Sequence, residues 1–189
     1  MICAILLAAG RSRRMGTQKL LLAFAGQTVI GHIADELLRS AIDRVIAVVG
    51  PAPGAVLPAI EGRGMTIATN PLAEGEMLSS VRCGLREIPA GCDAILVALG
   101  DQPAVGAKLI GRMIDAYRRE SAAGGQRGIV VPVHAGRRGH PLLFSSRYVA
   151  EILSDHDAAG LRGLLLAAII MASIDSPLAS LTACPHCAT

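Results

Sequence analysis

The stretch ICAILLAAG at residues 2–10 decides the fold. It begins with an apolar run, Ile2 to Leu7, and it ends in three small residues, Ala8, Ala9 and Gly10. A short apolar run without alternating polar residues predicts a strand that is buried on both faces of a sheet. We interpret it as a first strand and not as a signal peptide, because the basic residues follow the apolar run instead of preceding it.

Outward from this strand, apolar runs alternate with helical patterns. The apolar runs predict strands at residues 44–49, 65–69, 93–99, 128–133, 141–144 and 169–174. Apolar positions at helical spacing predict helices at residues 28–40, 54–60, 77–86, 108–118, 147–153 and 161–168, with a Gly/Ala-rich loop at 121–126. Because the strands lack polar alternation, we expect an α/β fold with a mostly parallel sheet covered on both faces. Ligands of such folds bind at the carboxyl ends of the strands, so the residues that follow strands are the informative ones.

Length and composition limit the classes of protein. The chain has 189 residues, which predicts one domain, at residues 1–175, with a C-terminal tail at 176–189. Hydrophobic residues make up 52% and charged residues 17%, which excludes intrinsic disorder. A net charge of +3, with two Phe, two Tyr and no Trp, argues against a nucleic-acid partner.

Membrane insertion and secretion are also disfavoured. The apolar run from Leu164 to Ala172 is shorter than the roughly 20 residues that span a bilayer, so we expect no membrane partner. The five cysteines are odd in number and irregular in spacing, which does not fit a disulfide framework. We therefore expect a cytoplasmic protein.

The segment after the first strand has the composition of a phosphate-binding loop. Small residues at 8–10 allow a close approach of the backbone, whose N–H groups can point at phosphate oxygens. Cationic side chains follow at Arg11, Arg13, Arg14 and Lys19. Lys19 is one of only two lysines in a chain with 18 basic residues, which indicates a site that uses a compact point charge. The spacing is not that of a Walker A loop, and a solvated basic turn is the alternative.

Polar residues also follow the strand at 93–99. Asp101 lies between Gly100 and the turn residues Gln102 and Pro103, where a carboxylate can hold Mg²⁺ facing phosphates. The alternative is an ordinary turn, in which Asp is common.

Two further loops carry candidate residues. Asn70 precedes Ser79 and Ser80, whose hydroxyl groups can contact a ligand or simply cap a helix. His140 lies in the loop at 137–141 that precedes an apolar strand. We expect a structural role for a lone histidine, since no nucleophile and acid accompany it.

Taken together, these motifs resemble the MobA-like nucleotidyltransferases, most of all the molybdenum cofactor cytidylyltransferase branch. The motifs that carry the resemblance are LAAGRSRRMGTQK at residues 7–19, Asn70 with GEMLSS at 75–80, GDQP at 100–103 and RGHP at 138–141. Guanylyl-transferring relatives tend to carry a Gly pair where this chain has Ala8-Ala9. The resemblance implies a three-layer α/β/α, Rossmann-like fold with a mixed, mostly parallel sheet.

The resemblance also implies the partners and the residue roles. Members transfer a nucleotidyl group from a nucleoside triphosphate, here CTP, to a molybdopterin-type or other phosphorylated acceptor, with Mg²⁺ or Mn²⁺, and contact a molybdoenzyme transiently. The implied catalytic residues are Arg14, Lys19 and Asp101. The implied nucleotide-binding residues are Leu7, Ala8, Ala9, Gly10, Ser12, Arg14, Gly16, Lys19, Asn70, Ser80 and Gly100. The implied acceptor-binding residues are Gln102, Pro103, Gly139, His140 and Pro141, and the implied metal ligands are Asp101 and Asp175.

The chain departs from the family near its end. Relatives usually carry an Asp-x-Asp-Thr-Pro stretch, whereas here Ser173 stands at the first position and Asp175 alone remains. Two alternatives therefore stay open beside the cytidylyltransferase. One is cytidylyl transfer to methylerythritol phosphate or a sugar phosphate, and the other is an accessory protein that binds a nucleotide or cofactor without turnover.

Overall fold

A six-stranded sheet forms the centre of the computed structural model, which describes residues 1–10, 18–72, 77–125, 128–135 and 137–155. The strand order is β5-β4-β1-β6-β10-β7. Strands β1, β4, β5 and β6 are parallel, and β10 runs antiparallel to both of its neighbours. The bounds are β1 Ile2–Ala8, β4 Arg44–Val49, β5 Thr66–Thr69, β6 Ala94–Leu99, β7 Ile129–Val130 and β10 Leu142–Ser145.

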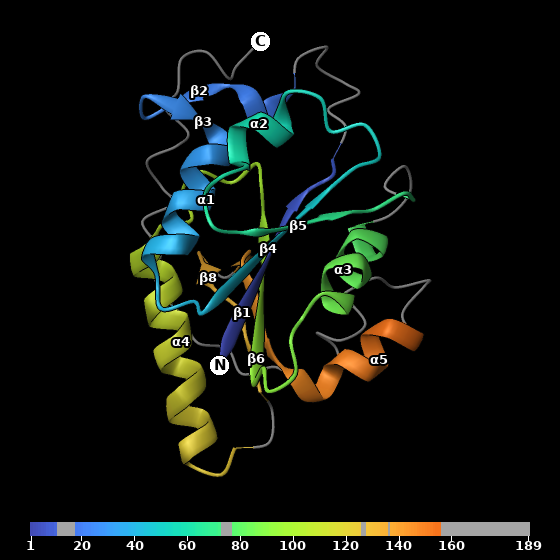
Figure 1. Cartoon of the computed structure of the whole chain (residues 1–189). Helices are drawn as coiled ribbons and strands as arrows, with labels where there is room; N and C mark the ends of the chain where they lie inside the picture. Colours follow the sequence, from blue (N-terminus) through green and yellow to red (C-terminus); the bar gives the residue numbers. More distant parts are fainter. Residues whose placement is uncertain (11–17, 73–76, 126–127, 136, 156–189) are drawn as a thin grey trace.

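Helices cover both faces of this sheet (Figure 1). Helices α1 (Val29–Arg39), α2 (Val56–Ile60) and α4 (Ala107–Ala122) pack on one face. Helices α3 (Met77–Arg86) and α5 (Val149–Ser154) pack on the other. The structure therefore confirms the three-layer α/β/α fold with a mixed, mostly parallel sheet.

Strand β1 shows why the apolar runs lack polar alternation. Ile2, Ala4 and Leu6 are buried in the core beneath α1 and α4, whereas Cys3 and Ile5 are buried beneath α3. Successive side chains of a strand point to opposite faces, so a strand that is covered twice needs apolar residues at every position.

Helix boundaries follow local chemistry. Helix α1 begins after Thr28, whose Oγ1 accepts a hydrogen bond from the Gly31 N–H at 3.1 Å. Helix α4 runs on to Ala122, so the loop predicted at 121–126 begins later than expected. It ends where Gly124 takes a φ of +73°, a conformation that glycine adopts without steric cost.

Two short hairpins were not predicted. Strands β2 (Ala23–Phe24) and β3 (Gln27–Thr28) form one, and β8 (Val133–His134) and β9 (Arg137–Arg138) form the other. The strand predicted at 128–133 is also shorter than expected, because Pro132 has no N–H group to donate to a ladder.

The helix predicted at 161–168, the strand at 169–174 and the domain boundary at 175 lie outside the described residues. Within the described ranges, no helix combines the length and apolar character that a membrane crossing requires. Cys3, Cys83 and Cys92 carry free thiols.

Two 3₁₀ turns complete the described elements. They are η1 (Lys19–Leu21), which precedes the β2–β3 hairpin, and η2 (Ser146–Tyr148), which precedes α5.

Candidate functional site

The candidate site lies where the strand order reverses. From β1 the chain first builds β4 and β5 on one side, and then returns to place β6 on the other side of β1. The carboxyl ends of β1 and β6 are neighbours: Leu7 pairs with Leu99, and the Gly100 N–H donates to the Leu7 carbonyl oxygen at 3.0 Å. Ligands of open α/β sheets bind at this kind of position.

Gly100 makes this close approach feasible. A Cβ atom at this position would lie 2.7 Å from the Leu7 carbonyl oxygen, 2.7 Å from Cδ1 of Ile30 and 3.2 Å from Cδ2 of Leu20. Any larger residue would therefore push β6 away from β1 or from the helical layer. Gly100 thus acts through packing between the two strand ends.

Gly10 differs from Gly100, because a Cβ atom there would meet nothing within 4 Å. Ala8 and Ala9 are buried at 4% and 8% exposure, and Gly10 is the first exposed residue after β1. Packing inside the described part of the chain does not demand a glycine at position 10. No described residue fills the space beside Gly10, which suits the close approach of a ligand.

Asp101 follows Gly100 directly and is exposed. Its turn is closed by hydrogen bonds from the Gln102 N–H to the Leu99 carbonyl oxygen at 3.4 Å and from the Val105 N–H to the Gln102 carbonyl oxygen at 3.1 Å. Within the described residues, the Asp101 carboxylate has neither a hydrogen-bond nor an ion-pair partner. It is therefore available to a ligand.

The antiparallel direction of β10 brings a distant loop to the same edge. Leu142, the first residue of β10, pairs with Val97 near the end of β6, so the preceding loop at 139–141 lies beside the Asp101 turn. Burial lowers the pKa of His140, and the charge of Asp101 acts in the opposite direction without outweighing it. A lowered pKa keeps the imidazole neutral near pH 7, so it can donate or accept a hydrogen bond.

The remaining acceptor-loop candidates surround these two residues. Gln102, Pro103 and His140 are partly buried, whereas Pro141 is buried and Gly139 is exposed. The Gly139 N–H donates to the Pro132 carbonyl oxygen at 2.9 Å, which ties the loop to the chain before β8. The structure thus brings the GDQP and GHP segments together.

Asn70 and Ser80 occupy the same edge but are nearly fully buried, at 3% and 5% exposure. The Asn70 side-chain amide donates to the hydroxyl oxygens of Ser79 and Ser80, both at 3.0 Å, and its carbonyl oxygen accepts from the Leu72 N–H at 3.0 Å. Both amide hydrogens are therefore used inside the protein. Asn70 ties the end of β5 to the start of α3, and Ser79, a partner absent from the predicted site set, takes part in this link.

Lys19 lies close to the same edge because the next residue, Leu20, packs beside Gly100. It opens η1 and is exposed, while the next residue, Leu20, is buried against the position of Gly100. The start of η1 is thereby fixed beside the end of β6. Ser12, Arg14, Gly16 and Asp175 lie outside the described residues.

The described residues do not contain a group of three or more His, Cys, Asp or Glu side chains that could hold a metal ion by themselves. Mg²⁺ is commonly held by one or two carboxylates together with substrate phosphates and water. The exposed carboxylate of Asp101, which has no partner among the described residues, fits that second arrangement.

Comparison with known proteins agrees with this geometry. Residues 4–172 match the model of the MobA-like NTP transferase domain. The crystal structure of Rv0371c from Mycobacterium tuberculosis superimposes with a TM-score of 0.79 at 30% identity, covering 92% of this chain and 88% of that one. A second structure of Rv0371c, a complex with manganese, gives a TM-score of 0.74.

Curated relatives match over shorter regions. The bifunctional protein GlmU of Symbiobacterium thermophilum is 31% identical over 125 residues, which is 65% of this chain but only 26% of GlmU. A probable molybdenum cofactor guanylyltransferase of Methanosarcina acetivorans is 31% identical over 126 residues, or 64% of this chain and 55% of the relative. The chain therefore spans about a quarter of GlmU and about half of the second relative.

Proposed function

Because the chain belongs to the MobA-like NTP transferase family, a family of nucleotidyltransferases, we propose that it transfers CMP from CTP to molybdopterin or the molybdenum cofactor and releases pyrophosphate. The observation that carries the proposal is the meeting of three loops at one edge of the sheet. These loops hold Gly10, Asp101 and His140.

The chemistry needs positioning and charge stabilisation more than covalent help from the protein. An oxygen of the acceptor phosphate attacks the α-phosphorus of CTP and forms a new P–O bond. The bond from the α-phosphorus to the bridging oxygen breaks, and pyrophosphate leaves with that electron pair. The attacking oxygen is already anionic, so no side chain has to remove a proton.

The residues of the edge can be assigned to this reaction. Backbone N–H groups at 8–10 face the triphosphate, and Asp101 holds the divalent cation, which neutralises phosphate charge when bound. Lys19, with Arg14, stabilises the charge that develops on the α-phosphate and on pyrophosphate. The GDQP and GHP segments line the acceptor side, where the neutral imidazole of His140 can hydrogen-bond a phosphate or pterin group.

Asn70 and Ser80 act indirectly in this proposal. Asn70 donates to Ser79 and Ser80 and accepts from the Leu72 N–H, so these residues tie the end of β5 to the start of α3 beside the nucleotide. We also propose that Asp175 is a second metal ligand. The proposed domain comprises residues 1–175, and the proposed location of the protein is the cytoplasm.

The choice of CTP depends on Ala8 and Ala9. The methyl groups of this pair occupy space that a glycine pair leaves free, and this added bulk disfavours a purine base. We therefore expect cytidylyl transfer in preference to guanylyl transfer.

Pyrophosphate release in a panel of CTP, GTP, ATP and UTP tests the proposal, each with molybdenum cofactor, methylerythritol phosphate or a sugar phosphate. We expect pyrophosphate release only in the combination of CTP with molybdenum cofactor, and EDTA should abolish this release. A GTP preference would overturn the cytidylyl assignment but not the family. Turnover only with a small phosphorylated acceptor supports the second candidate, and nucleotide binding without turnover supports an accessory protein.

A further inference from the structure

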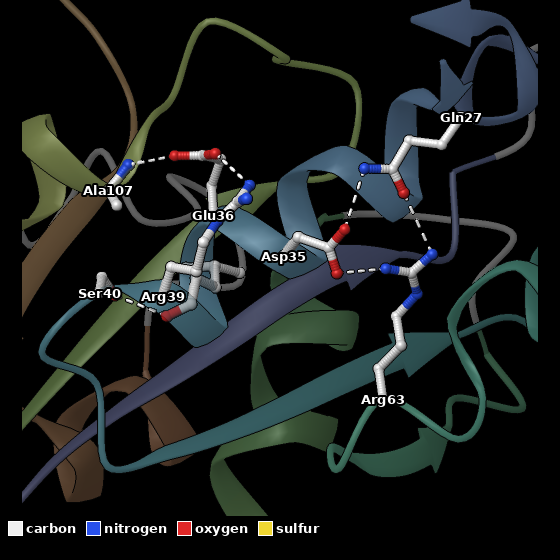
Figure 2. A network of polar contacts seen from close by, with 8 residues as sticks. Gln27, Asp35, Glu36, Arg39, Ser40, Arg63 and Ala107 are labelled. Carbon is white, nitrogen blue, oxygen red and sulfur yellow. Dashed lines mark hydrogen bonds and ion pairs between the residues drawn. The ribbon is translucent and has the colours of Figure 1, made fainter. Parts of the chain in front are cut away.

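Helix α4 begins immediately after the loop that carries Asp101, and its first residue has an unusual partner. Its N-cap position is Gly106, which has the extended backbone of a cap residue, φ −96° and ψ 162°, but no side chain to accept a hydrogen bond. The first N–H groups of a helix need acceptors from outside the helix. Glu36 of α1 supplies one, since its Oε2 accepts from the Ala107 N–H at 2.7 Å (Figure 2).

The Glu36 carboxylate is held in this position. Its other oxygen, Oε1, accepts from Nη2 of Arg39 one helical turn further on, at 2.5 Å, and the Glu36 side chain is only 18% exposed. An anion at the N-terminus of α4 is also favoured by the helix dipole. Glu36 therefore caps α4 from a different helix.

The cap has consequences for the loop at 100–106. At its start, the Gly100 N–H is bonded to the Leu7 carbonyl oxygen, and at its end the Ala107 N–H is bonded to Glu36. Asp101 lies between these two anchors. Loss of either anchor releases one end of the turn that presents the carboxylate.

Helix α1 also connects this loop to the Lys19 segment. The Val29 N–H at the start of α1 donates to the Leu22 carbonyl oxygen just after η1, at 2.9 Å. Cδ1 of Ile30, one residue further, lies against Gly100. One helix thus contacts both segments that carry the proposed catalytic charges.

We propose that Glu36 is a positioning residue. From helix α1 it caps α4 of the same chain, and it thereby holds the Asp101 turn in the geometry that binds the divalent cation. The proposal rests on the proposed function through the role of Asp101. The chain provides a matched control at the neighbouring position. Asp35 is bonded to Arg63 and to Gln27, as Figure 2 shows, and does not reach the Asp101 loop.

Four variants test the proposal: Glu36→Ala, Glu36→Gln, Asp35→Ala and the double variant Glu36→Ala with Gly106→Ser. Hydrogen exchange of the backbone amides at 100–109 reports on the loop. Electron paramagnetic resonance of free Mn²⁺, with CTP present, gives the Kd of the metal. Neither measurement requires turnover.

In Glu36→Ala we expect exchange at 100–109 to be about tenfold faster, because a charged hydrogen bond is lost. The Kd for Mn²⁺ should rise by about 10-fold to 100-fold, as is usual when a residue behind a metal ligand is removed. Glu36→Gln keeps an acceptor and should lie between the wild type and Glu36→Ala. Ser is a favoured N-cap residue, so Gly106→Ser should restore both properties in the Glu36→Ala background.

Asp35→Ala should lower the melting temperature without changing exchange at 100–109 or the Kd for Mn²⁺. Equal effects of Asp35→Ala and Glu36→Ala on the loop would overturn the proposal, as would faster exchange with an unchanged Kd. If the wild-type protein does not bind Mn²⁺, both the metal role of Asp101 and the positioning role of Glu36 are overturned. A wild-type protein that binds Mn²⁺ without releasing pyrophosphate overturns only the proposed function.

Discussion

At the amino-terminal edge of the central sheet, acidic side chains are bonded to the chain itself, whereas at the carboxyl edge Asp101 is presented to the solvent. The Asp43 Oδ2 accepts from the Ile2 N–H at 2.6 Å, and the Asp93 Oδ2 contacts the Met1 ammonium group at 2.5 Å. The Asp93 carbonyl oxygen accepts from the Tyr117 hydroxyl group at 3.1 Å. These aspartates connect strands and helices within the protein.

The carboxyl edge of the same strands is different. Small residues follow β1, Gly100 brings β6 against β1, and the Asp101 carboxylate has no partner within the described residues. A carboxylate that no residue of the fold uses is a candidate for function, whereas a bonded carboxylate is a candidate for stability. Four experiments test this difference between the two edges.

Asp101→Asn should have the largest effect. The amide keeps the size of the side chain but removes the anionic metal ligand, so turnover should fall by about 10³-fold or more. The melting temperature should stay near that of the wild type, because substitutions at exposed positions usually change stability by no more than about 0.5 kcal/mol. Retention of most of the wild-type rate would show that Asp101 does not hold the metal.

Lys19→Ala should come next. Loss of a cation that meets developing charge costs roughly 3–4 kcal/mol of barrier, or about 10²–10³ in rate, with little change in stability. Lys19→Arg should also be poor, because a planar guanidinium group replaces a compact ammonium group. Melting temperatures and rates of both variants are compared, and full activity in both would identify the loop as an ordinary basic turn.

Asp43→Ala, at the amino-terminal edge, should lower stability and leave the rate unchanged, which is the opposite of the result expected for Asp101→Asn. It removes the acceptor of the Ile2 N–H and should lower the free energy of unfolding by about 1 kcal/mol, as measured by urea denaturation. The rate per folded molecule should be unchanged. If Asp43→Ala lost tenfold in rate under conditions where all of the protein is folded, the two edges would not have separate roles.

His140 should give the smallest effect, visible only as a function of pH. Burial holds the pKa of His140 below its ordinary value of about 6.5, so the unfolded chain binds this proton at a higher pH than the folded chain does. The contribution of the neutral, buried His140 to the stability is fully present above about pH 6.5, and it is lost as the pH falls through the lowered pKa of the folded chain. Between pH 7.5 and 5.5 the wild type should lose more stability than His140→Gln, and equal losses would indicate that His140 is solvated.

Much of the fold could be predicted because both faces of the sheet are covered. The strand predicted at 44–49 and the helix at 77–86 have the bounds of β4 and α3, since uninterrupted β-branched runs and a regular apolar spacing leave few alternatives. Helix α4 extends four residues beyond its predicted end at Arg118, because its last turn has no apolar periodicity.

The two hairpins could not be predicted with the same rules. Each has strands of only two residues, too short to show alternation, and in each an alanine, Ala25 or Ala135, follows the first strand. Ala25 and Ala135 have φ values of 48° and 47°, which alanine rarely adopts. Asn-Gly or Asp-Gly is the usual signal for such a turn.

The candidate site shows the same limit. Its loops can be predicted because they follow strands and match family motifs. The contact between Glu36 and Ala107, at a sequence separation of 71, has no signal in the sequence, since an acidic residue on an amphipathic helix resembles any solvated side chain. The full pairing of the Asn70 amide was hidden for the same reason, because a motif does not reveal whether a polar group meets a ligand or the protein.

The antiparallel strand β10 also determines when the site can form. Strands β1, β4, β5 and β6 all precede β10 in the chain, so the ribosome makes the parallel part of the sheet first. The loop with His140 reaches Asp101 only when β10, which follows all four of these strands in the chain, pairs with β6. The residues of the nucleotide side are therefore synthesised before those of the acceptor side, and a chain that ends before β10 would lack the strand that brings the acceptor loop to Asp101.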